Sequence, residues 1–120
     1  MPTDIVLTPE QQQAALQTLP GWEIVRPSES SGEWLRRKYV TPGWPHTMLL
    51  ANALAYVAEA AWHHMDFELG YALVIVKIQT HRVRAITDSD IALARRVEEI
   101  ACWKPPANSP LPGFPKNWVH

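Results

Sequence analysis

The pattern of apolar and polar positions along the chain predicts three helices and three strands. In the helical segments apolar residues recur every three or four positions, whereas in the extended segments they alternate or run together between turn residues. The predicted helices span residues 9–19, 46–62 and 88–102, and the predicted strands span residues 22–26, 33–40 and 71–81.

Capping residues mark where two of these helices begin. Thr8 precedes Pro9, and an N-cap followed by a first-turn proline favours a helix start. Thr87 and Asp90 have the spacing of a capping box, in which each side chain bonds the backbone N–H of the other residue. Pro20 ends the first helix. These signals predict separate elements joined by short turns.

The order of the elements predicts an α+β fold. Along the chain it is α-β-β-α-β-α, which is typical of helices packed on one face of an antiparallel sheet. A sheet of only three strands has exposed edges. We therefore expect pairing with further copies of the chain, in a homodimer or a homotetramer.

Prolines set the C-terminal end apart from this domain. We predict a domain over residues 1–104 and a tail over residues 105–120, where five prolines prevent regular secondary structure. The tail also carries the aromatic residues Phe114 and Trp118. Because burying aromatic rings is favourable, we expect the tail to dock on the domain or on a neighbouring subunit.

Composition and charge narrow the class of protein. The chain has 120 residues, of which 47% are hydrophobic and 19% are charged, and this suits one compact domain. A net charge of −1 without a basic cluster argues against direct nucleic-acid binding. Cys102 is the only cysteine, and no apolar segment is long enough for a membrane span. The N-terminal residues lack the pattern of a signal peptide, so we expect a cytoplasmic protein.

Three of the five histidines lie near the ends of predicted elements. His63 and His64 follow the second helix, and His81 ends the third strand. Glu59 lies four residues before His63, one helical turn away, so we expect these two side chains to meet. Because imidazole exchanges protons near neutral pH, the group indicates acid–base chemistry.

Six positions match the spacing of a known motif. The motif has an acidic residue, a histidine pair, an aromatic residue, a further histidine and an aspartate, found here as Glu59, His63, His64, Tyr71, His81 and Asp90. The Leu-Pro-Gly-Trp sequence at 19–22 and the start of the last helix fit the same pattern. In these features residues 8–102 resemble the pterin-4a-carbinolamine dehydratases.

The resemblance implies a reaction and the residues that carry it out. Members of this family dehydrate 4a-hydroxytetrahydropterin to quinonoid dihydropterin and water, with no metal and no other cofactor. By resemblance, His63 and His81 transfer the protons, while His64 binds and orients the pterin. The substrate is then a small-molecule pterin.

By the same resemblance, three further residues support the site. Glu59 is expected to hold the second ring nitrogen of His63 and to favour its charged form. Asp90, near a helix N-terminus, is expected to anchor His81 or the edge of the substrate. Trp22 is expected to provide a flat wall for the bicyclic ring.

The sequence departs from the family pattern around the expected mouth of the pocket. Trp62 stands where many members have Asp or Asn, and Met65 stands where Pro, Cys or Ser is preferred. The segment 82–85, Arg-Val-Arg-Ala, replaces a stretch that is often acidic or contains glycine. These differences concern the substrate and the rate more than the fold.

Simpler interpretations apply to individual residues. His46 and His120 have no partner at a patterned spacing, and we interpret both as structural or simply exposed. Trp22 can equally be a core residue. Asp90 can be no more than the capping partner of Thr87.

Two other functions compete with the dehydratase. Glu59, His63 and His81 could form a metal-binding face of two histidines and one carboxylate. The fold also occurs in proteins without enzymatic activity, so the other alternative is a Rubisco assembly factor or a dimerisation cofactor of a transcription factor. The presence of all three histidines favours the enzyme.

Overall fold

Residues 5–120, which the computed structural model describes, form three helices and four strands. In chain order these elements are α1 (Pro9–Gln17), β1 (Trp22–Val25), β2 (Trp34–Val40), α2 (Trp44–Ala61), β3 (Met65–Gly70), β4 (Leu73–Ile78) and α3 (Asp88–Ala101). The segment 102–120 that follows contains no helix or strand. Within the described residues, no helix is both long and apolar enough to cross a membrane.

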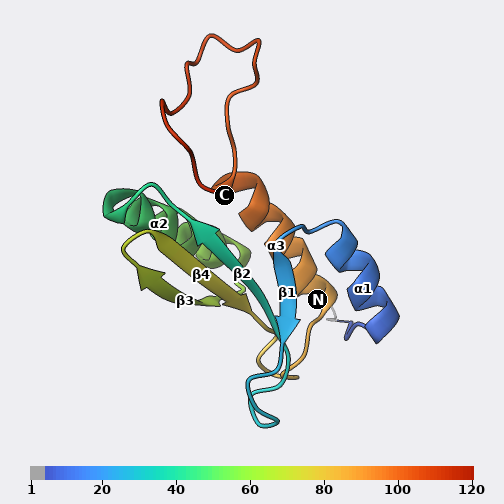
Figure 1. Cartoon of the computed structure of the whole chain (residues 1–120). Helices are drawn as coiled ribbons and strands as arrows, with labels where there is room; N and C mark the ends of the chain where they lie inside the picture. The colour runs from blue at the N-terminus through green and yellow to red at the C-terminus, as the bar shows by residue number, and fades with distance from the viewer. Residues whose placement is uncertain (1–4) are drawn as a thin grey trace.

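The four strands form one antiparallel sheet in the order β1-β2-β4-β3. Helices α2 and α3 pack together against one face of this sheet (Figure 1). The predicted α+β class, with helices on one face of an antiparallel sheet, is therefore confirmed.

The number of strands is corrected from three to four, because β3 was not predicted. Asp66, Glu68 and Gly70 have low strand propensity, so this segment has a weak local signal. Backbone pairing with β4 stabilises this segment as a strand despite its low propensity. The pairing runs from Met65 opposite Ile78 to Gly70 opposite Leu73. The element order is thus α-β-β-α-β-β-α, and the predicted strand 71–81 begins only after the turn at residues 71–72.

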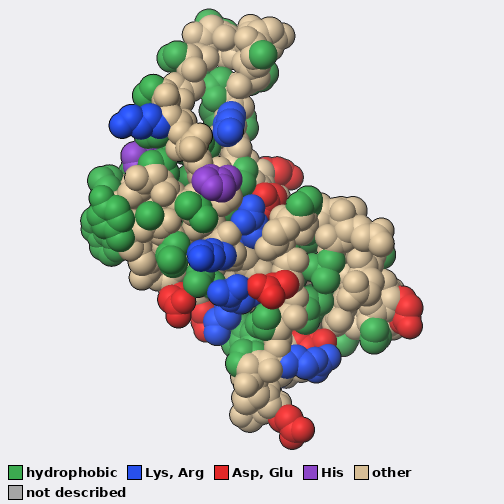
Figure 2. All heavy atoms as spheres, viewed as in Figure 1, with side chains coloured by type: hydrophobic (Ala, Val, Ile, Leu, Met, Phe, Trp, Pro, Cys, Tyr) green, Lys and Arg blue, Asp and Glu red, His purple; other side chains and the backbone are tan. Residues whose placement is uncertain are grey.

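The hydrophobic core lies between the sheet and the two helices. Its buried members on β2, β4, α2 and α3 include Leu35, Tyr39, Val74, Val76, Ile78, Leu54, Ala58, Ala94 and Val97. Because side chains alternate along a strand, the opposite face carries another set of residues, which combines charged side chains with the buried Trp34 and Ile75. Figure 2 shows basic and acidic side chains gathered over this open face, where Arg36 and Glu23 form an ion pair of 2.8 Å.

Both predicted capping signals are confirmed. Thr8 and Gln11 form a capping box at the start of α1. At the start of α3, Thr87 and Asp90 form the second, in which the Thr87 backbone N–H donates to Asp90 Oδ2 at 2.7 Å. Helix α2 begins at Trp44, two residues before the predicted start, because a proline fits its first turn.

The C-terminal segment leaves α3, extends outward as a loop and returns to the body (Figure 1). At its end, His120 and Val40 exchange backbone hydrogen bonds of 2.8 and 3.1 Å. The neighbouring Val119 is buried in the core. The end of the chain thus extends the backbone pairing of β2 beyond the end of β1.

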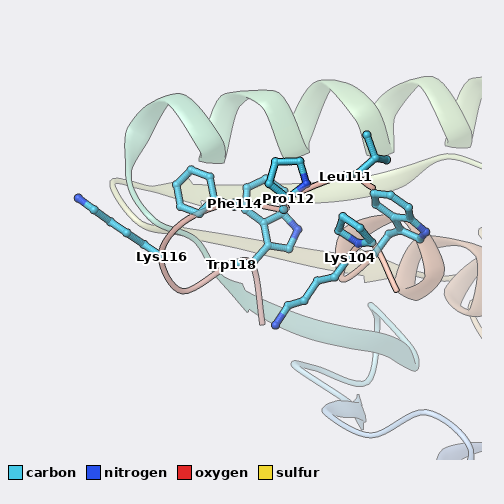
Figure 3. Close-up of a pocket in the computed structure, with 9 residues that line it drawn as sticks. Lys104, Leu111, Pro112, Phe114, Lys116 and Trp118 are labelled. Atoms are coloured by element: carbon cyan, nitrogen blue, oxygen red, sulfur yellow. The ribbon is translucent and has the colours of Figure 1, made fainter. Parts of the chain in front are cut away.

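Aromatic contacts hold the returning segment against the start of α2. The His46 ring contacts Phe114 and Trp118 edge to face, with centroids 4.9 and 5.6 Å away. The loop encloses a cavity of about 500 Å³, shown in Figure 3, whose lining residues are Trp103, Lys104, Pro105, Leu111, Pro112, Gly113, Phe114, Lys116 and Trp118. His46 therefore has a packing role, as predicted.

Candidate active site

The three predicted site histidines lie at the same end of the β3–β4 hairpin. His63 and His64 directly precede β3, and His81 follows β4 after two residues. Because Met65 at the start of β3 pairs with Ile78 at the end of β4, both segments leave the sheet at one end. Strand pairing thus places histidines that are far apart in the sequence at one end of the sheet.

Asp90 is the centre of a buried hydrogen-bond network at this end. Its side chain is fully buried, and its Oδ1 lies 2.7 Å from His63 Nε2. Its Oδ2 accepts hydrogen bonds from the Thr80 hydroxyl at 2.8 Å and from the Thr87 backbone N–H at 2.7 Å. The carboxylate therefore connects α3 with the end of α2 and with the end of β4.

This network corrects the partner predicted for Asp90. The expected partner was His81 or the edge of the substrate. The carboxylate instead holds His63, because the first turn of α3 packs against the end of α2. A carboxylate only accepts hydrogen bonds, so Nε2 of His63 carries the proton between them. Asp90 is thus both the capping partner of Thr87 and the residue that orients His63.

The predicted contact between Glu59 and His63 is also corrected. Glu59 Oε1 lies 2.8 Å from Nε2 of His64, and both side chains are more than half exposed. Helix α2 ends at Ala61, and Trp62 adopts a left-handed conformation with φ 55° and ψ 43°. The chain therefore leaves the helical path before His63, and helical spacing no longer describes the pair.

His81 lies on the open face of the sheet. Its Nδ1 is 3.3 Å from Gln79 Oε1, and its ring meets Trp34 edge to face with centroids 5.7 Å apart. The Gln79 amide in turn donates to the carbonyl oxygens of Ser31 and Glu33, at 2.6 and 2.9 Å. Gln79 and Trp34 contact the His81 ring, and the sequence analysis did not single out either residue. Strand alternation, which places Gln79 and His81 on one face, is the signal that could have found Gln79.

The loop after His81 lies against the loop between β1 and β2 (Figure 1). The Glu33 backbone N–H donates to the Arg84 carbonyl at 3.1 Å, and the Arg84 side chain donates to the Ser30 carbonyl at 2.9 Å. The segment 82–85, which departs from the family pattern, is therefore attached to the loop that also supports Gln79.

A cavity of about 560 Å³ opens between the end of α2 and the start of α3. Its lining residues are Val57, Ala61, Trp62, His63, Ser89, Ala92, Leu93 and Arg96. His64 and His81 do not line it. Of the three histidines, His63 therefore faces this cavity, with its ring held from behind by the buried Asp90.

Trp22 lies apart from the histidines, in the core. Its side chain is 6% exposed, and its ring meets Tyr39 edge to face at 6.5 Å. The indole N–H donates to Glu98 Oε1 at 2.9 Å. A ring enclosed in this way cannot offer a face to a substrate, so the placement supports the core interpretation of Trp22.

Glu98 accepts hydrogen bonds from several side chains next to Trp22. The Tyr39 hydroxyl donates to its Oε1 at 2.6 Å, and the Arg37 guanidinium lies 3.3 Å from the same oxygen. Burial by itself raises the pKa of Glu98, but the hydrogen bonds from Tyr39, Trp22 and Arg37 and the charge of Arg37 hold it below its ordinary value of 4.5. The ionised form is therefore favoured in the folded state.

Replacing Glu98 with glutamine is expected to lower the free energy of unfolding by about 2 kcal/mol at pH 7, since hydrogen bonds to a charged group are lost. A carboxyl pKa that folding lowers stabilises the protein above the unfolded-state value, and this stabilisation disappears as the pH falls through the folded-state value. The difference between wild type and Glu98→Gln should therefore shrink below pH 4.5. Urea unfolding between pH 7 and pH 3 measures it, and a constant difference would contradict the assignment.

The alternative metal face is not assembled. Within residues 5–120, no three His, Cys, Asp or Glu side chains form a group suited to a metal ion. Of the three residues in that hypothesis, Glu59 is paired with His64 and His63 with Asp90. Each of these two histidines instead forms a hydrogen-bonded pair with one carboxylate.

Known proteins are similar to this chain in sequence and in fold. The model of a family described as pterin 4 alpha carbinolamine dehydratase matches residues 5–100. Two bacterial relatives are provisionally named pterin-4-alpha-carbinolamine dehydratase. The relative from Aquifex aeolicus is 35% identical over 94 residues, covering 78% of this chain and 89% of the relative. The relative from Thermomicrobium roseum is 40% identical over 86 residues, covering 72% and 86%.

Two solved structures are similar to this chain in fold. The crystal structure of a transcriptional coactivator/pterin dehydratase from Brucella melitensis matches with a TM-score of 0.72 and 28% identity, covering 81% of this chain and 99% of that one. A pterin dehydratase-like protein identified as a RuBisCO assembly factor in the alpha-carboxysome shares the fold, with a TM-score of 0.57 at 18% identity, covering 68% and 90%. From the family match and the relatives, we conclude that the chain belongs to the pterin-4a-carbinolamine dehydratase family.

Proposed function

We propose that this protein dehydrates 4a-hydroxytetrahydropterin to quinonoid dihydropterin and water by histidine acid–base catalysis. The observation that carries the proposal is the pair of His63 and buried Asp90 beside an open cavity. Membership of the family supports a pterin carbinolamine dehydratase activity. The pair supports the mechanism, because an imidazole held by a buried carboxylate is positioned for proton transfer.

The proposed reaction needs two proton transfers. One imidazole gives a proton to the 4a-hydroxyl group, which leaves as water with the electron pair of its C–O bond. A second imidazole takes the proton of a ring nitrogen, and the electrons of that N–H bond form the new double bond. His63 and His81 are the proposed pair on the strength of the family motif. Their segments leave the sheet at the same end of the hairpin, where His63 faces the cavity and His81 lies on the open face beside Trp34.

The other residues support this pair in different ways. Asp90 holds Nε2 of His63, so that proton exchange with the substrate takes place at Nδ1. His64 is proposed to bind the pterin, with its own ring held by Glu59. Glu59 thus becomes a positioning residue for the binding histidine rather than for the proton-transfer pair.

The test is the dehydration rate of freshly generated 4a-hydroxytetrahydropterin, with and without the protein. An acceleration that rises in proportion to protein concentration is the expected result. A folded protein that leaves the spontaneous rate unchanged would contradict the proposal.

A binding function is the second candidate, favoured by the exposed face of α2. Leu49 and Tyr56 are 64% and 77% exposed, and Glu59 is the only charged residue of this helix of 18 residues. An uncharged helix face of this kind is typical of a protein interface. We infer that α2 and the edge strand β3 contact further copies of the chain in a homo-oligomer. If the protein did not accelerate dehydration, partner binding through this face would become the favoured function.

A further inference from the structure

We propose that Trp62 is a substrate-binding residue, whose indole forms one wall of the pterin site between His63 and His64. The inference rests on the proposed dehydratase function and names a specificity residue within it. Trp62 directly precedes the histidine pair in the sequence.

The first support is the position of the ring. Trp62 lines the cavity that His63 also lines. Its indole meets the His64 ring edge to face, with centroids 5.0 Å apart and an angle of 75° between the planes. One aromatic surface thus reaches from the binding histidine to the cavity beside the proton-transfer histidine.

The second support is the backbone at this residue. Trp62 is the C-cap of α2 and has φ 55°, in the left-handed region. Glycine, and to a smaller extent asparagine and aspartate, adopt this region readily, while bulky residues pay a steric cost. A tryptophan is therefore a poor choice for folding alone at this position.

The third support is the exposure of the ring. The Trp62 residue is 74% exposed, so little of the indole contributes to the core. The left-handed backbone does not favour an indole here, and the ring contact of Trp62 is with His64, whose side chain is itself 53% exposed. A residue that is unfavourable in both respects at a site suggests a role in binding.

The ligand chemistry follows from the walls of the cavity. Val57, Ala61, Ala92 and Leu93 make it largely apolar, and its volume of about 560 Å³ is in the range of small-molecule sites. A flat heteroaromatic ring system gains affinity by stacking on an aromatic side chain. The bicyclic pterin ring is such a ligand, and stacking on Trp62 would place it beside His63.

The experiment compares wild type with Trp62→Asn, Trp62→Phe and the control Trp103→Asn, which changes an exposed tryptophan outside this cavity. Steady-state dehydration gives kcat and KM, and equilibrium dialysis gives the affinity for oxidised biopterin, a stable pterin. Thermal unfolding and sedimentation velocity report stability and oligomeric state.

We expect Trp62→Asn to weaken biopterin binding and raise KM about ten- to a hundredfold, with kcat changed by less than about threefold. Trp62→Phe should retain most of the affinity, and Trp103→Asn all of it. The melting temperature of Trp62→Asn should not fall, since asparagine tolerates the left-handed conformation better. A purely structural role predicts the opposite, a lower melting temperature.

Other outcomes separate this inference from the proposed function. If wild type dehydrates the substrate but Trp62→Asn leaves KM and biopterin affinity unchanged, the binding role of Trp62 is refuted and the proposed dehydratase activity is retained. If wild type binds biopterin through Trp62 without accelerating dehydration, the binding role of Trp62 is supported and the proposed reaction is refuted. A change in oligomeric state with unchanged affinity would instead assign Trp62 to a protein interface, and the absence of any pterin binding would overturn both.

Discussion

Replacing His63 with alanine is expected to slow dehydration about a hundred- to ten-thousandfold, the usual effect of losing one positioned proton-transfer group. The cavity faces this ring, and Asp90 fixes its orientation. The rate constant of the catalysed reaction, measured under single-turnover conditions, reports the loss directly. Since His63 also satisfies a buried carboxylate, the alanine variant should lose stability as well.

A second variant separates chemistry from stability. The side-chain amide of His63→Gln can still donate a hydrogen bond to Asp90, but it cannot exchange protons near neutral pH. His63→Gln should therefore be as slow as His63→Ala and more stable in urea. His120→Ala, which alters an exposed histidine whose backbone pairs with Val40, is the matched control and should retain the full rate. A His63→Gln enzyme with the wild-type rate would refute the role of His63.

Replacing Asp90 with alanine is expected to destabilise the protein by about 3–5 kcal/mol, because several donors lose one buried acceptor at a cost of about 1–3 kcal/mol for each group left unsatisfied. The fully buried carboxylate is the shared acceptor for Thr80, Thr87 and His63. Without it, these donors are left unsatisfied. Because a domain of this size is stable by only about 5–15 kcal/mol, much of Asp90→Ala should unfold under mild denaturant. Urea unfolding followed by circular dichroism measures the difference.

Asp90→Asn keeps the volume and tests the orientation of His63. Its oxygen can still accept from Thr80 and Thr87, while its amide presents an N–H to Nε2 of His63. The imidazole must then carry its proton on Nδ1, the atom proposed to face the substrate. We expect a smaller loss of stability than in Asp90→Ala, together with a clear fall in kcat. Wild-type kcat in a folded Asp90→Asn protein would mean that Asp90 is structural only.

Local signals in the sequence determined where the helices lie and where α1 and α3 begin. The capping boxes at Thr8 and Thr87 depend on residues within four positions of each other, so no distant contact is needed to recognise them. The sequence also predicted that His63, His64 and His81 lie at the ends of elements, and strand register places these ends at one end of the sheet. The class of fold followed from the order of those elements.

Only the tertiary structure decided which side chains meet. Strand β3 forms because β4 pairs with it, although its own residues favour a strand only weakly. Asp90 meets His63 rather than His81 because α3 packs against α2. Trp22 meets Glu98 because its indole, on the core side of β1, reaches a side chain of α3.

The partner of Glu59 shows the same limit on a smaller scale. Helical spacing predicted His63, and one left-handed residue at Trp62 redirected the contact to His64. Local periodicity thus determined which residues reach this end of the molecule. The pairs among them depended on chain direction at the helix end and on packing between elements distant in sequence, which periodicity does not encode.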